Sequence, residues 1–238
     1  MFDPFDRKFF DSRDQIYVLV DAAFFRNVYF KAGNKLDSDE YIEQLVKTIS
    51  DSAYKCWNGF YGETGTKFVV RVFYFDSKPI SSTIVHPLDG TNFDLSETKT
   101  FKFSCEVIAK LEERGDFTVS LGYSMGAKFE LNEGVLEKVL AGAINISELD
   151  KRYFHFAVSQ KNVDMMIGVK MISIAHSGKA DRLILIAGDS DFAPAIRYAI
   201  DLGLNVTLNP LGRHVNRELI NTGCEILTNI CQSDKSMV

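Results

Sequence analysis

The sequence has few cysteines and no long apolar run. Its four cysteines are scattered without a C-x-x-C pair, so neither a zinc site nor a disulfide framework is indicated, and buried thiols are expected. No apolar stretch approaches the roughly 20 residues that cross a bilayer. The first residues carry acids where a secretory signal would have a basic and then an apolar region. We therefore expect a cytoplasmic protein with no membrane segment.

The chain also lacks an excess of positive charge. Its formal net charge of −5 argues against a protein that coats nucleic acid by charge alone, although a local basic rim around an acidic site is compatible with it. The glycine-containing loop GETGT is not followed by the lysine and helix of a phosphate-binding loop. A phosphatase or nucleotide-binding enzyme of that kind therefore has no support.

What the chain does have is the composition of a globular protein with an aromatic core. Hydrophobic residues make up 46% of its 238 positions, and 19 of them are Phe and 9 are Tyr. This length suits one generous α/β domain. We predict a single domain over residues 1–238, with an elaboration over about 78–159. Periodicity is weak between 126 and 156, and no linker composition flanks that stretch.

Apolar runs and helical spacings alternate along the chain. Continuous apolar runs predict strands at 15–21, 67–76, 117–123, 181–189 and 204–210. Apolar residues at helical spacing predict helices at 38–57, 95–114, 161–177 and 192–202. A short helix or a turn is expected at 24–31, and the tail from 216 to 230 has room for one more helix and a short strand. A loop is expected from 77 to 92. This alternation predicts a three-layer α/β fold with a central parallel sheet and helices on both faces.

Aspartates gather where these strands end. Asp21 and Asp189 follow apolar strands, Asp191 comes two residues later, and Asp164 lies in the first turn of the helix at 161–177. In open parallel sheets ligands bind outside the carboxyl ends of the strands. Each acid alone could equally be a helix cap, but together they repel one another unless a cation neutralises them. Mg²⁺ or Mn²⁺ suits such oxygen ligands and supports in-line displacement at a phosphodiester.

Four segments resemble a known family. The order VLVDAAFF, RVFYFD, QKNVDMMIGVKM and RLILIAGDSDFAPAIRYAIDLGLNVTL is similar to the NYN domain, a branch of the PIN-like metal-dependent ribonuclease superfamily. The resemblance runs from about 16 to 227 and is loose over 78–159. It implies a PIN-like fold, Mg²⁺ or Mn²⁺ as cofactor and RNA as substrate. By position it implies catalytic and metal-binding roles for Asp21, Asp164, Asp189 and Asp191, with Ser190 between the last two.

Two positions depart from the family pattern. Phe24 stands where the family usually has Asn, and Lys170 stands where it usually has a second acid six residues after the first. Lys170 could neutralise an acid in place of a metal, contact a phosphate, or extend to solvent from its helix. The aspartates and the resemblance together lead us to expect a metal-dependent endoribonuclease that cleaves single-stranded or structured RNA. The alternative is a catalytically weakened NYN module that binds RNA or a protein partner in a regulatory role.

Basic and aromatic residues near the predicted edge suggest how RNA is held. The aromatic run Phe24, Phe25, Tyr29 and Phe30 could stack on an unpaired base, pack in the core or form a dimer contact, so a homo-oligomer is left open. Basic and hydroxyl side chains could hold the phosphate backbone. These nucleic-acid-binding candidates are Arg26, Lys161, Lys170, Ser190, Arg213, His214 and Arg217, with Lys31 nearby.

Overall fold

Strands and helices alternate along the chain in the computed structural model, which describes residues 15–61, 69–180 and 182–228. The strands are β1 (Gln15–Asp21), β2 (Val69–Ser77), β3 (Thr83–Val85), β4 (Asn92–Asp94), β5 (Phe117–Leu131), β6 (Phe154–Lys161), β7 (Arg182–Ile186), β8 (Asn205–Asn209) and β9 (Glu225–Ile226). The α-helices are α1 (Ala22–Lys31), α2 (Ser38–Tyr61), α3 (Lys99–Arg114), α4 (Glu133–Leu140), α5 (Val163–Ser177), α6 (Ala193–Asp201) and α7 (Arg217–Ile220). Short 3-10 turns are η1 (Leu95–Glu97), η2 (Ile146–Glu148), η3 (Lys151–Tyr153) and η4 (Ser190–Phe192).

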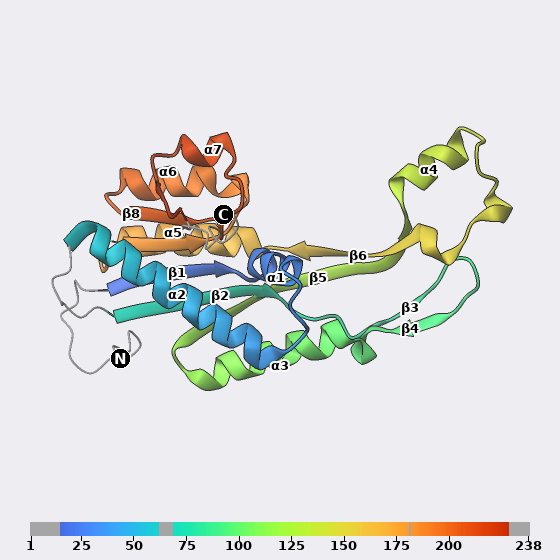
Figure 1. The fold of residues 1–238 in the computed structure, drawn as a ribbon, viewed down its shortest axis with the longest axis horizontal. Helices are drawn as coiled ribbons and strands as arrows, with labels where there is room; N and C mark the ends of the chain where they lie inside the picture. The colour runs from blue at the N-terminus through green and yellow to red at the C-terminus, as the bar shows by residue number, and fades with distance from the viewer. Residues whose placement is uncertain (1–14, 62–68, 181, 229–238) are drawn as a thin grey trace, which may run out of the picture.

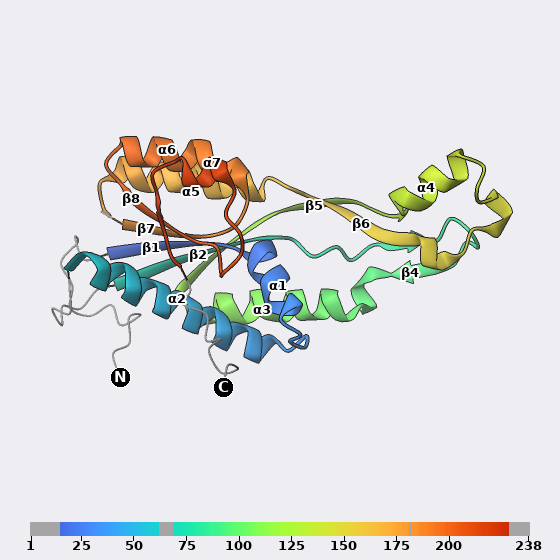
Figure 2. The ribbon, with the colours of Figure 1, turned by 45° about the horizontal axis from the view of Figure 1, so that its top comes forward.

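One twisted sheet organises the molecule. Within the described residues it has seven strands in the order β6-β5-β2-β1-β7-β8-β9, and every neighbouring pair is parallel except β5 and β6. Helices α1, α2 and α3 lie on one face, and α5, α6 and α7 lie on the other (Figures 1 and 2). The predicted three-layer α/β fold is therefore confirmed, with β6 as an antiparallel edge strand.

The central strands are apolar along their whole length because both faces of the sheet are covered. In β1, Ile16 and Val18 pack with the helices α1, α2 and α3. Tyr17 and Leu19, which point the other way, pack with α5 and α6. Alternate side chains thus enter two separate cores, which explains why this strand shows no alternation of apolar and polar residues.

An arm projects from the body where β5 extends beyond the end of its parallel neighbour β2. The first part of β5 pairs with β2, and from Tyr123 to Leu131 it pairs with β6, with an irregularity between Met125 and Lys128. Figure 1 shows this ribbon projecting from the body, with α4 near its tip and the β3–β4 hairpin alongside. Among the residues described, α4 contributes none that is buried. The arm lies mostly within the segment 78–159 that we expected to be an elaboration, but this segment also contains α3 and the first part of β5, which belong to the body.

Several predicted boundaries were wrong in this region. The expected loop at 77–92 contains β3, a strand too short for its period to be visible in the sequence. The helix expected from 95 starts as a 3-10 turn, and α3 begins after Thr98, whose hydroxyl accepts the N–H of Phe101 at 3.2 Å. The strand expected at 117–123 continues to 131.

Some sequence predictions lie outside the described residues. These are the loop GETGT, the start of the strand expected at 67, residue 181, the end of the tail and Cys231. Of the other cysteines, Cys56 is buried and Cys105 and Cys224 are partly buried, all as free thiols in the described part of the chain. No helix in that part is both long and apolar enough to span a membrane.

Candidate functional site

Asp21 ends the central strand and begins a helix. Its carboxylate accepts the backbone N–H of Phe24 at 3.1 Å and so caps α1. The residue is only 7% exposed. Burial raises the pKa of Asp21 to about 6, and the negative charge of Asp164 adds to that shift. A carboxylate is therefore held in a place that disfavours its charge unless a cation is near.

Asp164 reaches the same edge from the start of α5. The chain turns from β6 into this helix through Asn162, which has a left-handed φ of 71°. Gly122 in β5 permits a close approach here, because a Cβ at this glycine would lie 2.6 Å from the carbonyl oxygen of Lys161. Desolvation of the carboxylate raises the pKa of Asp164, and the charges of Asp189 and Asp191 raise it further.

Asp189 and Asp191 lie on the turn that follows β7. The Asp189 carboxylate accepts the backbone N–H of Asp191 at 3.0 Å and caps η4, so the capping alternative holds for this residue as it does for Asp21. Both residues are exposed, and Ser190 between them is partly buried. Capping uses one carboxylate oxygen and leaves the other free to bind a ligand.

The four predicted acids thus share one end of the sheet. Asp164 acts electrostatically on Asp21, and Asp189 and Asp191 act on Asp164. Within the described ranges, no three acidic, His or Cys side chains are close enough to form a ready-made metal cage. A magnesium ion needs only one or two carboxylates, since it keeps several waters and takes further oxygens from a phosphate. The mutual repulsion and hard oxygen donors of this set fit such an ion.

A fifth aspartate, Asp76, was not among the predicted site residues. It is the penultimate residue of β2, beside the central strand, and is 2% exposed. Both terminal nitrogens of Arg26 donate to its carboxylate, one of them at 2.7 Å. Burial alone would lower the pKa of Arg26, but the hydrogen bonds and charge of Asp76 raise it overall. The available signal was the same apolar run ending in an acid that marked Asp21.

This ion pair bears on the role predicted for Arg26. With its two Nη atoms held by Asp76, the side chain has a structural partner and only its remaining N–H groups are free for phosphate. The charge of Arg26 still reaches the acid cluster, where it acts to lower the pKa of Asp21. Arg26 therefore binds Asp76 through hydrogen bonds and acts on Asp21 through its charge.

The other predicted phosphate contacts occupy different places. Lys161 is exposed at the end of β6, three residues before Asp164. Arg213 and His214 are exposed in the loop after β8. Arg217 is exposed at the start of α7, which packs against η4, whereas Lys31 lies at the end of α1 away from Asp21.

Lys170 lies over an aromatic ring of the sheet. Its Nζ is 3.9 Å from the centroid of the Phe73 ring, which in turn stacks on Tyr17. Partial desolvation lowers the pKa of Lys170. Among the described residues no carboxylate lies within ion-pair distance of it. The geometry therefore gives the lysine a cation–π partner in place of an acid.

The aromatic side chains that follow Asp21 do not all lie in the core. Phe25 and Tyr29 are buried and make edge contacts with Tyr41, which favours the core-packing alternative for them. Phe24 differs, because its ring lies against the backbone of Gly188, where an added Cβ would overlap it. Phe24 thus covers the chain segment that leads to Asp189.

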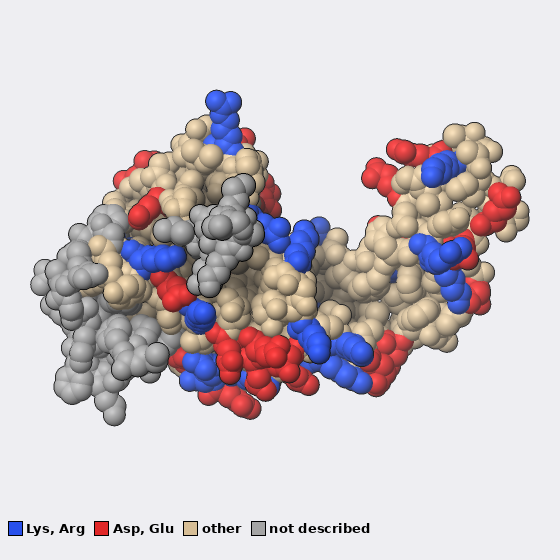
Figure 3. All heavy atoms as spheres, in the orientation of Figure 1, with Lys and Arg blue, Asp and Glu red and all other residues tan. Residues whose placement is uncertain are grey.

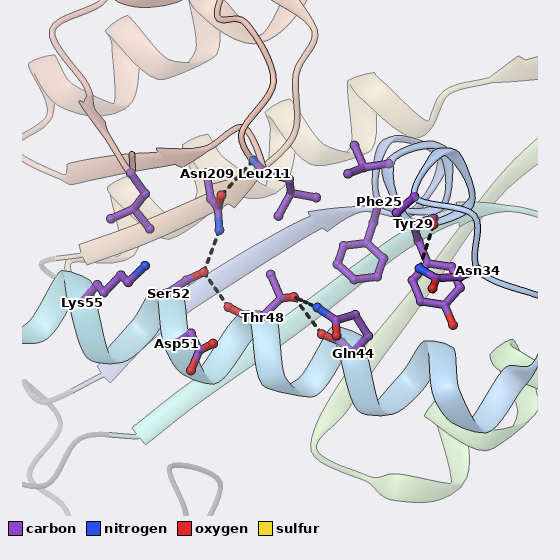
Figure 4. Close-up of a pocket in the computed structure, with 13 residues that line it drawn as sticks. Phe25, Tyr29, Asn34, Gln44, Thr48, Asp51, Ser52, Lys55, Asn209 and Leu211 are labelled. Carbon is purple, nitrogen blue, oxygen red and sulfur yellow. Dashed lines mark hydrogen bonds between the residues drawn. The ribbon is translucent and has the colours of Figure 1, made fainter. Parts of the chain in front are cut away.

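A polar cavity of about 390 Å³ lies between α2 and the end of β8 and is lined by none of the four predicted acids (Figure 4). Its buried polar groups satisfy one another. The Asn209 amide donates to Ser52 at 2.7 Å, and the Ser52 hydroxyl donates to the Thr48 carbonyl at 2.6 Å. The Asn209 side-chain oxygen accepts the N–H of Leu211 at 2.9 Å. These bonds anchor α2 to the sheet, and the acid cluster remains the candidate site.

Comparison with known proteins identifies the family. No curated protein matches the chain. A protein of unknown function from Vibrio parahaemolyticus has a crystal structure similar to this chain with a TM-score of 0.42 and 18% identity, over 92% of this chain and 95% of that one. A likeness at this level carries no argument about function. The family model described as NYN domain matches residues 87–226, which include Asp164, Asp189 and Asp191, while Asp21 and Asp76 precede the match. The chain belongs to the NYN domain family.

Proposed function

We propose that this protein is a metal-dependent endoribonuclease. The observation that carries the proposal is the convergence of Asp21, Asp164, Asp189 and Asp191 at the carboxyl end of the sheet. Membership in the NYN family supports it, because that family suggests a PIN-like nuclease. The substrate would be RNA, and the cofactor Mg²⁺ or Mn²⁺.

Each acid has a distinct place in this proposal. Asp189 and Asp191, which are exposed on one turn, would hold the metal, with Asp164 facing them from α5. When bound, the metal would activate a water and stabilise the leaving oxygen of the displaced phosphodiester. Asp21, buried and fixed by its capping bond, would orient the attacking water by accepting its hydrogen bond.

Cationic and hydroxyl groups around the acids would hold the RNA backbone. Lys161 and Arg217 approach the edge from opposite sides, through β6 and through α7. Ser190 can donate its hydroxyl to a phosphate oxygen from between the two exposed acids. Arg213 and His214, on the loop after β8, would contact phosphates farther along the strand. Lys170, held over Phe73, would contact phosphate only after leaving that ring.

The test is cleavage of an end-labelled, unstructured RNA in Mn²⁺, in Mg²⁺ and in chelator. Wild-type protein should cut internal bonds with metal and not with chelator. Asp189→Asn should reduce the rate at least a hundredfold, because a metal-binding oxygen is lost. Asp201→Asn is the matched control, since this exposed aspartate ends α6 at the opposite edge of the sheet. Equal activity of Asp189→Asn and wild type would contradict the proposal.

A catalytically weakened RNA-binding module is the second candidate. Two observations favour it: Phe24 lies over Gly188 beside the acids, and Lys170 stands where the family usually has a further acid. This candidate expects metal-independent RNA binding and no cleavage in any metal. The cleavage assay, combined with a binding assay in chelator, separates the two functions.

A further inference from the structure

A large cleft opens at the root of the arm, close to the acid cluster. It has a volume of about 530 Å³ and lies between α3, the β3–β4 hairpin and the β5–β6 ribbon. This volume is in the range of small-ligand pockets. Figure 3 shows that the molecule narrows between the body and the arm, the region to which the cleft residues belong. The cleft residues belong to the arm and to the body, so a ligand there would touch both.

The lining of the cleft is aromatic. Four phenylalanines contribute to it, two of them at 40% and 46% exposure, so part of each of these two rings is accessible to a ligand. Exposed rings of this kind offer faces on which a planar group can stack. The four are Phe93, Phe101, Phe129 and Phe156, of which Phe93 and Phe156 are the exposed ones.

Polar groups are placed among these rings. Ser124 and Gln160 face each other across the β5–β6 ribbon and both line the cleft. Gln160 is exposed and its amide offers both donors and acceptors. The Arg26–Asp76 pair also lines the cleft. Aliphatic side chains such as Ile84 and Val158 complete the lining. Apolar walls with stacking faces and a few polar groups suit a planar heterocycle.

Two connections join the cleft to the acid cluster. Gln160 is followed by Lys161, Asn162 and Val163, so three residues separate this cleft residue from Asp164. On the other side, Arg26 lines the cleft and its charge acts on Asp21. Arg26 thus lies between the cleft and the buried Asp21.

We propose that the cleft receives an unpaired nucleobase of the RNA strand whose phosphodiester lies at the acid cluster. This inference rests on the proposed function and adds the substrate class: single-stranded RNA with a base turned out of its stack. Phe156 stacks on the base, and Gln160 hydrogen-bonds its edge. A base held in a duplex cannot enter the cleft, so paired RNA is excluded.

The test measures affinity for a fluorescent single-stranded RNA and for the same RNA with abasic positions. All proteins carry Asp189→Asn, so that cleavage does not interfere, and the binding buffer contains Mg²⁺. Phe156→Ala should weaken binding of the normal RNA about tenfold and leave binding of the abasic RNA unchanged. Tyr54→Ala, which removes an equally exposed aromatic ring from α2 outside the cleft, should change neither affinity. Gln160→Ala should alter the preference among bases.

The outcomes separate this inference from the proposed function. If the wild type cleaves RNA but Phe156→Ala binds normal RNA as tightly as its parent, the cleft proposal is wrong and the nuclease stands. If no RNA is cleaved but base-dependent binding still requires Phe156, the cleft proposal stands and the nuclease fails. Equal weakening for normal and abasic RNA, or no binding of either, overturns the cleft proposal. So does an apolar dye that binds the wild-type protein, loses its binding in Phe156→Ala, and is not displaced by RNA.

Discussion

The strand β5 runs through both the body and the arm of this protein, but its neighbours differ between the two regions. In the body, β5 has β2 beside it, and α3 packs against it. From Tyr123 onward, β6 is its only hydrogen-bonded strand partner among the described residues, and large apolar side chains such as Met125 become exposed. The acids that need fixed positions lie on the part with two cores, and the aromatic cleft lies where those cores end. In our proposals, cleavage therefore takes place on the body and base recognition at the root of the arm.

The largest expected contrast between the halves is in their ion pairs. Asp76→Ala leaves the guanidinium of Arg26 in a mostly buried place without its partner, and should lower the free energy of unfolding by about 3–5 kcal/mol. On the arm, Glu130→Ala removes an exposed pair with Lys128 and should leave the melting temperature unchanged. Denaturant melts of both variants measure this. The double variant Arg26→Leu with Asp76→Leu should recover much of the loss, and failure to do so would mean that the pair is not the cause.

The next contrast concerns charge at the acid cluster in metal-free protein. The pKa of Asp21 in the fold, about 6, is above its usual value, so the folded state binds more protons between about pH 4 and 6. Stability should therefore fall as pH rises through that window, and ionised Asp21 is unfavourable at neutral pH. Asp21→Asn keeps an oxygen for the cap of α1 and should stabilise the protein in chelator by about 2 kcal/mol at pH 7.

Measuring the stability of Asp21→Asn at lower pH and with added metal provides two controls. At pH 4 wild-type Asp21 is protonated, so the difference in unfolding free energy between Asp21→Asn and wild type should vanish. Saturating Mn²⁺ should reduce the advantage at pH 7, because the cation then stabilises the carboxylate. A variant that is less stable than wild type at pH 7 would show that capping by the charged carboxylate outweighs its burial.

The body of the fold could be predicted because its strands are buried on both faces. The strand predicted at 15–21 has the same bounds as β1, because a short continuous apolar run such as QIYVLVD is typical of a buried parallel strand. The arm could not, because β3 has three residues and β5 changes its neighbours midway along the strand. Apolar periodicity carries no information about such a change.

The acid site shows the same division between local and tertiary information. Asp21 and Asp189 were recognisable from the strands before them, and Asp164 from the helix that it opens. The partner of Asp76 is Arg26, 50 residues earlier, and the ring under Lys170 belongs to β2. These contacts depend on how α1 and α5 pack on the sheet, which residue spacing along one chain does not specify.

A smaller contrast compares glycines in the two regions. Gly188→Ala places a methyl group into the ring of Phe24 and should cost about 1–2 kcal/mol of stability. Gly134→Ala, within α4 on the arm, meets no atom within 4 Å and should be neutral or slightly stabilising. Thermal melts of both proteins provide the comparison. Adding Phe24→Ala to Gly188→Ala should remove the penalty specific to the clash; if the penalty persists, backbone effects at Gly188 explain it.

The smallest expected effect concerns Lys170, on which the choice between enzyme and binding module partly depends. Lys170→Met keeps the apolar stem over Phe73 and removes the charge, so stability should fall by only about 0.5–1 kcal/mol, the size of a cation–π contact. Because the ammonium is held by that ring and no acid pairs with it among the described residues, Mn²⁺ affinity measured by calorimetry should stay within twofold of wild type. Lys179→Met, at an exposed position after the end of α5, controls for the loss of one positive charge. A clear rise in Mn²⁺ affinity in Lys170→Met alone would mean that the lysine competes with the metal for the carboxylates, and the weakened-module alternative would then gain its strongest support.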